Sequence, residues 1–265
     1  QRAPGAALPG RRGGARIRPS EGPDLRYRPR TDREMAGRTI AVGDVHGDLE
    51  GLERLLSRLP VLLPEDTLLF VGDYLDRGPR PADVVRRVRS LSGETAAKVV
   101  LLRGNHEDAW LKACRVGAPE FVLPRGNGCY QTYRSFTGGA PPAREEDPTP
   151  EELRSMATGA FLPADVVEWM KGLPLWHEDE HAIYVHAGLP FEGGRWLHPS
   201  EVKEPRPLLW QRSRAFYQEY AGKRVVFGHT PVKRLPQEQS AHTPADALDV
   251  YLPPSLVGLA PGAGM

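Results

Sequence analysis

The sequence predicts an α/β fold with mostly parallel strand pairing. Three short apolar runs in the first half of the chain are each followed by a segment whose leucine or valine residues recur at helical spacing. Strand–helix alternation of this kind is typical of domains in which helices connect neighbouring parallel strands. Each run also ends in a glycine followed by polar residues, and in such sheets ligands bind at the carboxyl ends of the strands.

The elements follow one another regularly from Arg38 onward. The three apolar runs begin at residues 38, 66 and 97, and the helices after them are predicted over 48–59, 81–91 and 107–114.

The second half of the chain is less regular. Residues 115–160 are predicted to form loops and a cap. A helix is expected over 163–173, and apolar runs at 181–189 and 223–232 are expected to form strands. Beyond Val232, only residues 247–252 have the character of a strand.

We expect three regions along the chain. Residues 1–37 are rich in Gly, Pro and Arg without helical or strand periodicity, so they are expected to form a disordered basic extension. The stretch from Met35 reads like a natural protein start, so the residues before it are interpreted as upstream sequence. Residues 38–232 are expected to form the functional domain, with its cap at 115–160, and residues 233–265 an atypical C-terminal tail.

Charge and cysteine content exclude several classes of protein. Nine arginines against four acidic residues make residues 1–34 basic, so the body is mildly acidic and a dedicated nucleic-acid surface on it is not expected. No apolar run approaches the roughly 18–20 residues that span a membrane, and no secretory signal is evident. With only Cys114 and Cys129, a disulfide framework is not expected, and a reduced, cytoplasmic protein fits best.

Polar residues that can bind a metal ion follow five of the apolar runs. The motifs GDVHG (43–47), GDYLDRG (72–78) and GNHE (104–107) follow the first three, and VHAG and FGHT end two later ones. Their carboxylate, imidazole and amide groups suit manganese, iron or zinc. We therefore expect a metal site at the carboxyl ends of the strands.

The spacing of these residues indicates two ions. Asp44 and His46 are two residues apart, so on extended backbone both would point to one side and bind one ion. Asp73 stands alone after its strand and could bridge to a second ion, which would be completed by Asn105, His186 and His229. Two ions about 3.5–4 Å apart can hold a bridging hydroxide and stabilise an in-line displacement at phosphorus.

Together, the five motifs resemble the signature of the phosphoprotein phosphatase family of metallophosphoesterases, over roughly residues 38–232. The resemblance implies a calcineurin-like β-sandwich flanked by helices, with residues 38–232 as the catalytic domain. It also implies two divalent metal ions, with manganese expected and iron or zinc as alternatives. Hydrolysis would proceed by direct attack of a metal-bridging hydroxide, without a covalent phosphoenzyme.

The resemblance also implies roles for residues beside the metal ligands. Asn105 and His106 would diverge on extended backbone, so that Asn105 binds the second ion while His106 protonates the leaving oxygen. Asp76 would hold and polarise His106. Arg77 would bind the phosphate as a bidentate donor, and Arg212 in LLWQR would supply a second phosphate clamp.

Three functions remain open. The chain resembles the short bacterial and phage branch of the family, because RGNGCYQTYRSF is similar to its cap segment NGGxxTxxSY, with Cys129 where a second glycine is usual. The main interpretation is a phosphatase of phosphoserine or phosphothreonine in proteins and peptides, because GDYLDRGP keeps the acid at Asp76. The alternative is a dinucleoside polyphosphate hydrolase, such as a diadenosine tetraphosphatase. In those enzymes the second motif usually resembles GDLVARGP, whereas this chain has GDYLDRGP. The third is an inactive metal-binding regulatory module, suggested by a tail that lacks the family's IDTG-like segment.

Overall fold

A three-stranded parallel sheet supports the first half of the protein. The computed structural model describes residues 37–240 and 249–260, so nearly all of the predicted basic extension, including the expected start at Met35, lies outside the described residues. Strands β1 (Thr39–Val42), β2 (Thr67–Phe70) and β3 (Lys98–Leu101) pair in parallel in the order β1-β2-β3. All three strands end at the same level of the ladder, which confirms the expected parallel arrangement.

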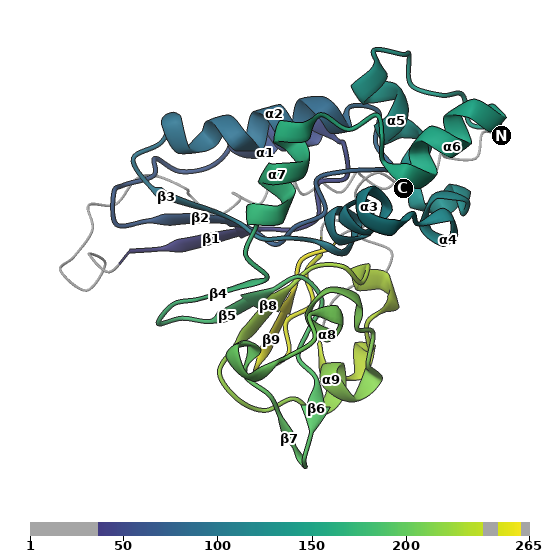
Figure 1. Cartoon of the computed structure of the whole chain (residues 1–265). Helices are drawn as coiled ribbons and strands as arrows, with labels where there is room; N and C mark the ends of the chain where they lie inside the picture. Colours follow the sequence, from purple (N-terminus) through teal and green to yellow (C-terminus); the bar gives the residue numbers. More distant parts are fainter. Residues whose placement is uncertain (1–36, 241–248, 261–265) are drawn as a thin grey trace, which may run out of the picture. The chain divides into compact units, whose positions relative to one another are not determined.

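Both faces of this sheet are buried, which explains why its strands read as continuous apolar runs. Along β2, Leu68 and Phe70 pack on one side among apolar residues of α1 (Leu49–Leu56) and α2 (Pro81–Ser90). The neighbouring Leu69 and Val71 belong to a separate cluster on the other side of the sheet. Figure 1 shows α1 and α2 lying along the sheet.

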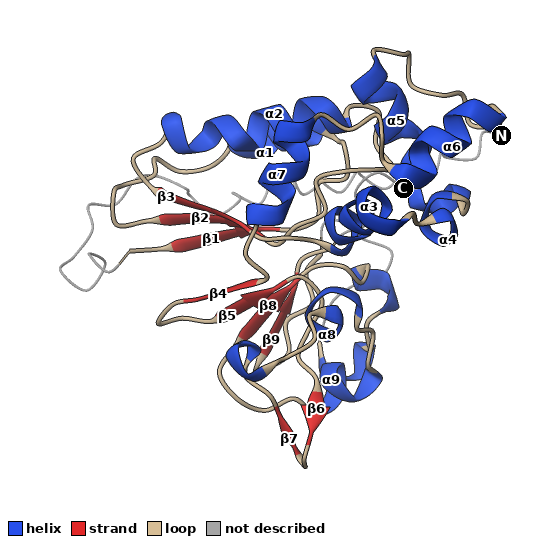
Figure 2. Ribbon diagram, viewed as in Figure 1, coloured by secondary structure: helices blue, strands red, loops and turns tan. Residues whose placement is uncertain are grey.

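The second sheet packs against that other face. It contains β4 (Trp176–Glu178), β5 (Ile183–Val185), β8 (Val225–Phe227) and β9 (Leu256–Gly258), in the order β4-β5-β8-β9. The pair β4–β5 is antiparallel and the other two pairs are parallel. Tyr184 and Val226 from this sheet share a buried cluster with Leu69 and Val100 from the first, so the two sheets form a sandwich (Figure 2).

A smaller group of elements covers the outer side of the second sheet. The hairpin of β6 (Phe191–Glu192) and β7 (Arg195–Trp196) precedes α8 (Arg206–Trp210) and α9 (Arg214–Glu219). Phe216 of α9 is fully buried against Phe227 of β8, with ring centroids 5.8 Å apart. The expected helix over 163–173 is confirmed as α7 (Ala164–Gly172).

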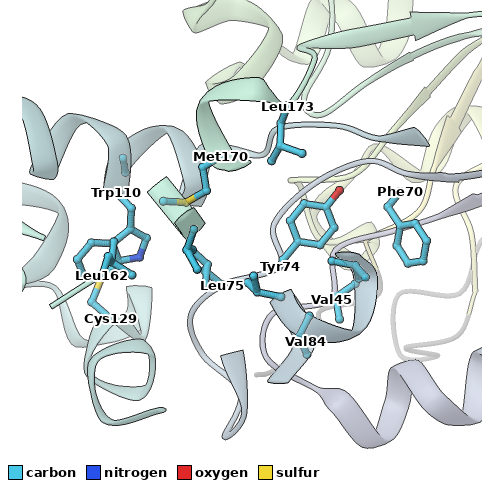
Figure 3. Packing of buried hydrophobic residues seen from close by; sticks show 14 of the residues in the cluster. Val45, Phe70, Tyr74, Leu75, Val84, Trp110, Cys129, Leu162, Met170 and Leu173 are labelled. Atoms are coloured by element: carbon cyan, nitrogen blue, oxygen red, sulfur yellow. The ribbon is translucent and has the colours of Figure 1, made fainter. Parts of the chain in front are cut away.

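The prediction of loops over residues 115–160 is wrong, because this region is largely helical. It contains the end of α3 (Asn105–Val116), then α4 (Pro119–Val122), α5 (Cys129–Thr137) and α6 (Pro150–Thr158). The start of α6 carries a capping box, in which Thr149 and Glu152 each accept a hydrogen bond from the other's backbone N–H. Figure 3 shows Trp110, Cys129 and Leu162 packed in the part of the core that these helices enclose.

The position of the C-terminal strand also differs from the prediction. Of the expected strand at 247–252, residues 247–248 lie outside the described part, and Tyr251 forms only an isolated bridge to Gly258. The strand that extends the second sheet is β9, whose Leu256 pairs with Val225 of β8. The tail after residue 232 therefore contributes a strand to the sandwich, although it lacks the expected motif.

Short 3₁₀ turns occur at Leu91–Gly93, Arg125–Asn127, Pro199–Glu201, Val232–Arg234 and Gln237–Gln239. Both cysteines are free thiols, as the sequence predicts. Among the described residues, the helices are all too short or too polar to cross a membrane.

Candidate metal centre and active site

The predicted site residues come together at the carboxyl ends of the strands. Asp44 and His46 follow β1, Asp73 follows β2, and Asn105 begins α3 directly after β3. The second sheet contributes one residue after β5 and one after β8. All six side chains are buried, with at most 8% of any residue exposed; they are Asp44, His46, Asp73, Asn105, His186 and His229.

Asp73 is the central carboxylate of the site. Its Oδ2 atom lies 3.4 Å from His46 Nε2 and 3.4 Å from His186 Nε2. On the His46 side, Asp44 Oδ2 lies 3.8 Å from the same His46 Nε2. One carboxylate therefore stands between an imidazole of the first sheet and an imidazole of the second, which is where a shared ligand of two ions has to lie.

Asn105 occupies the other side of the site. Its Oδ1 atom lies 2.8 Å from His186 Nε2 and 2.8 Å from His229 Nδ1. The atoms of Asp73, His186 and His229 that could hold a metal lie within 4.8 Å of one another, as do those of Asp73, His46 and His106. The structure thus contains two overlapping candidate groups that meet at Asp73.

The protonation of His46 and His229 suits metal binding. The Nδ1 atom of His46 lies 2.9 Å from the Leu75 carbonyl oxygen, an arrangement that leaves Nε2 free to act as a ligand. Within the described part of the chain, the buried Nε2 atoms of His46 and His229 have no hydrogen-bond partner. Burial lowers the pKa of His46 to about 3 and that of His229 to about 2, so both rings are neutral at pH 7, the form that binds a metal.

The carboxylates of the site also fit a cation. Burial, together with the nearby charge of Asp73, raises the pKa of Asp44 to about 6. Two buried carboxylates this close repel each other, and a bound divalent cation would relieve that repulsion. The donor set of nitrogen and oxygen atoms therefore fits the divalent ions expected from the sequence.

The backbone of the site is strained at five positions. Every non-glycine residue with positive φ in the described part of the chain belongs to one of the motifs, with φ between 46° and 68°: His46, Asp73, Asp76, Arg77 and His229. Each such conformation costs roughly 1–3 kcal/mol and persists only where surrounding contacts hold it. Strain concentrated in this way is typical of functional sites.

Glu107 holds much of this strained backbone, and the sequence analysis assigned it no role. Its buried carboxylate accepts hydrogen bonds from the backbone N–H groups of Asp73, Tyr74 and Leu75, and from Gly104 at the start of its own helix, at 2.9–3.2 Å. The sequence could have identified this residue, because Glu107 is the last residue of the GNHE motif.

Two glycines give the carboxylates room. A Cβ atom at Gly104 would lie 2.1 Å from Asp73 Oδ1, and one at Gly228 would lie 2.1 Å from Asp44 Oδ1. Real Cβ atoms do not approach oxygen this closely, so a side chain at either position would displace a carboxylate of the site.

His106 and Asp76 form a buried pair beside the metal centre. The His106 Nδ1 atom lies 2.7 Å from Asp76 Oδ2, and Trp110 Nε1 and Thr132 Oγ1 donate to the same carboxylate. Burial opposes protonation of His106, but the charges of Asp73 and Asp76 outweigh it, so its pKa lies above the ordinary value. Trp110 and Thr132 were not identified from the sequence, although Thr132 is the threonine of the quoted cap segment.

The two predicted phosphate-binding arginines lie on the open side of the site. Arg77 Nη2 lies 3.3 Å from His106 Nε2, which points away from Asp76. Arg212 follows α8 and is partly exposed, and its charge interacts with the charges of Arg77 and Asp73. The structure thus places the guanidinium group of Arg77 beside the nitrogen that would meet a leaving group.

Two predictions of extended backbone at the site are wrong. Asn105 and His106 were placed on extended backbone, but they form the first turn of α3, where a rotation of about 100° per residue separates their side chains. Asp44 and His46 were also placed on extended backbone, but β1 ends at Val42 and His46 has φ of 46°. Turn geometry therefore brings these side chains together.

Comparison with known proteins finds one family and several relatives. A family model for calcineurin-like phosphoesterases matches residues 37–233. A symmetrical bis(5'-nucleosyl)-tetraphosphatase of Dechloromonas aromatica is 30% identical over 151 residues, which are 57% of this chain and 44% of that protein. The protein of the same name in Coxiella burnetii is 27% identical over 172 residues, 63% of this chain and 47% of that protein.

The chain thus spans about half the length of these curated relatives, or less. Among solved structures, a cold-active protein-tyrosine phosphatase of a Shewanella species is similar with a TM-score of 0.49 and 15% identity, covering 85% of this chain and 71% of that chain.

Proposed function

Since the chain belongs to the calcineurin-like phosphoesterase family, we propose that it hydrolyses dinucleoside polyphosphates of the diadenosine tetraphosphate type. This is the alternative that the sequence analysis held open beside a protein phosphatase. The two relatives described above, each matching more than half of this chain, support it, because both are named as symmetrical bis(5'-nucleosyl)-tetraphosphatases.

The buried donors suit two divalent ions: Asp44, His46 and Asp73 would hold one, and Asp73, Asn105, His186 and His229 would hold the other. When bound, such ions supply Lewis-acid stabilisation at phosphorus and lower the pKa of water to near neutrality. The surrounding chain determines how substrate is held there. Arg77 and Arg212 would bind the phosphate oxygens as bidentate donors, since a guanidinium matches their geometry better than an ammonium does.

His106 would supply the proton that the leaving oxygen takes up. Its Nε2 atom lies 3.3 Å from Arg77 Nη2 and 3.9 Å from Asp73 Oδ2, while Asp76 accepts a hydrogen bond from Nδ1. This contact fixes the ring and favours its protonated form. As hydroxide adds to phosphorus and the bond to the leaving oxygen breaks, the proton on Nε2 would pass to that oxygen.

An aromatic pocket beside the metal centre supports the proposed dinucleotide substrate. It has a volume of about 420 Å³ and is lined by Phe121 and Trp210, together with polar groups that include Asp108, Asn127 and Glu204. The Phe121 ring centroid lies 5.2 Å from that of His106, and the Trp210 centroid lies 6.4 Å from that of His229. A base next to the scissile phosphate would therefore meet an aromatic surface, where stacking contributes roughly 1–3 kcal/mol.

The polar lining of this pocket suits a purine. Asp108 and Glu204 are acceptors, and the exocyclic amino group of adenine is a donor. A phosphoserine side chain has no comparable group to occupy this space.

A phosphomonoesterase acting on phosphoproteins is the second candidate, and the Asp76–His106 pair favours it. A serine alkoxide is a poor leaving group and needs a proton in the transition state, whereas a nucleotide phosphate leaves more easily. An acid held as firmly as His106 would therefore contribute more to monoester hydrolysis.

A substrate panel tests the proposal. We expect kcat/KM for diadenosine tetraphosphate to exceed that for a phosphoserine peptide, measured in the same divalent metal. Trp210→Leu should lower kcat/KM for diadenosine tetraphosphate about tenfold more than for p-nitrophenyl phosphate, because only the dinucleotide has a base to stack. Trp196→Leu is the matched control, since Trp196 lies outside the aromatic pocket. Preference for the phosphopeptide would reject the proposal in favour of the second candidate.

A further inference from the structure

A second pocket near the metal centre is lined by four basic side chains and one acidic one. It has a volume of about 470 Å³, and its basic residues come from two segments that follow α8 and β8: Arg212, Arg214, Lys233 and Arg234. The lining contains one acidic side chain, Glu238, whose Oε1 lies 3.4 Å from Arg214 Nη2. We call this space the cationic pocket.

The backbone that presents two of these basic side chains is held by buried residues. Lys233 and Arg234 lie in the 3₁₀ turn Val232–Arg234, which is fixed by the buried side chains of Val232 and Leu235 in the core of the second sheet. The backbone N–H of Val232 also donates to the Ala260 carbonyl at 2.9 Å. The two basic side chains are therefore presented at a defined place, although they are themselves exposed.

The pocket adjoins the metal centre at Thr230. This residue lines the pocket, directly follows the candidate ligand His229, and forms a buried 2.8 Å hydrogen bond with Tyr217, which also lines it. Arg212 joins the two sites, because its charge acts on His229 on one side and on Arg234 on the other. Partial burial and the repulsion from Arg234 and Arg77 lower the pKa of Arg212.

The cations of this pocket are largely unpaired. Many exposed arginines in the described part of the chain form ion pairs with carboxylates, such as Arg86 with Asp83 and Arg195 with Glu201. Among the described residues, by contrast, Arg212, Lys233 and Arg234 form neither a side-chain hydrogen bond nor an ion pair. Like charges gathered in one pocket repel each other and raise its affinity for an anion.

We propose that the cationic pocket binds the phosphate groups of the substrate that are not cleaved. The inference rests on the proposed function, since a dinucleoside polyphosphate carries a chain of anionic phosphates beyond the one held by Arg77 and Arg212. Those phosphates would extend past Thr230 to Lys233 and Arg234, while the nearer base lies in the aromatic pocket. A phosphomonoester has no further phosphate and would use only the metal centre.

Calorimetric binding of inorganic phosphates tests this pocket without requiring turnover. Tripolyphosphate and orthophosphate are each titrated into the full chain, with equal divalent metal in both solutions. The test variant is Lys233→Ala/Arg234→Ala. The control is Arg54→Ala/Arg58→Ala, which removes the same charge from an exposed stretch at the end of α1.

We expect wild type and control to bind tripolyphosphate more tightly than orthophosphate. The pocket variant should weaken tripolyphosphate binding about tenfold more than orthophosphate binding. The charge-preserving variant Lys233→Arg/Arg234→Lys should bind nearly as wild type does. Equal losses in the pocket and control variants, or no preference for tripolyphosphate in wild type, would overturn the inference.

The outcome is separable from the proposed function. If the pocket variant loses tripolyphosphate binding but the wild-type protein does not hydrolyse diadenosine tetraphosphate, the phosphate-binding role of the pocket stands and the proposed substrate is wrong. If the pocket variant hydrolyses diadenosine tetraphosphate with an unchanged KM, the proposed substrate stands and the phosphate-binding role of the pocket is wrong.

Discussion

The Nδ1 atom of His106 lies 2.7 Å from the Oδ2 atom of Asp76, and both side chains are buried. Asp76 also accepts hydrogen bonds from Trp110 and Thr132, so three groups hold this carboxylate in place. A carboxylate fixed so firmly sets the orientation of the imidazole and increases its tendency to carry a proton.

Replacement of Asp76 by Asn should slow hydrolysis most for substrates with poor leaving groups. Asn retains the shape but cannot stabilise protonated His106, and loss of a general acid typically costs 10²–10⁴-fold in rate, with about 10²-fold expected here. The measurement is kcat for a series of aryl phosphates of differing leaving-group pKa. A uniform decrease across the series would show that Asp76 does not act through proton donation.

Removal of Asp73 should abolish binding of both metal ions, because its Oδ2 atom faces imidazoles on both sides of the site. We expect elemental analysis to find about two ions per wild-type chain and almost none in Asp73→Ala. His46→Ala should lose about one ion, since His46 belongs to one side only. Retention of a full metal complement by Asp73→Ala would contradict the shared position.

Substitution of Gly228 by Ala should displace Asp44. The new Cβ atom would lie 2.1 Å from Asp44 Oδ1 and 2.8 Å from a Val71 methyl carbon, so the carboxylate has to move. We expect metal affinity to fall roughly 10–100-fold, the range typical of a disturbed ligand environment. Gly172→Ala is the matched control, because nothing lies within 4 Å of its new Cβ atom. Equal metal affinity in the two variants would disprove the steric argument.

The pH dependence of stability should report the Asp66 carboxylate. Asp66 is fully buried, and chiefly its hydrogen bond from Arg38 holds its pKa below the ordinary value. A depressed carboxyl pKa stabilises the fold above the unfolded-state pKa, near ~3.9, and this contribution disappears as the pH falls through the folded-state pKa. Asp66→Asn should therefore lower the free energy of unfolding at pH 7 by about 1–3 kcal/mol.

Denaturant unfolding at pH 7 and at about pH 3 measures this difference, which should shrink at the lower pH. Glu168→Gln provides a control, because that exposed pair with Lys171 contributes little. A difference that is constant with pH would mean that Asp66 acts through packing rather than charge.

The strands of the first sheet could be predicted because their signal is local. Leu68, Leu69 and Phe70 are consecutive, and a run buried on both faces needs no knowledge of its partners to be found. The cap was harder, since its helices α5 and α6 contain many polar residues and owe their stability to packing around Trp110 and Phe161. The strand β9 is three residues long and forms only because β8 offers it an open edge.

The sequence by itself determined the kinds of functional group and the order in which they follow the strands. Spacing along the chain cannot reveal which groups face each other, because the contacts of Asp73 with His186 and of Asp44 with His229 join residues more than a hundred positions apart. Only the tertiary structure showed that Asn105 and His106 diverge within a helix, that Glu107 holds the strained turn, and that Arg212 meets Lys233 and Arg234 in one pocket. Periodicity is a property of neighbouring residues, whereas a site is assembled by the packing of two sheets.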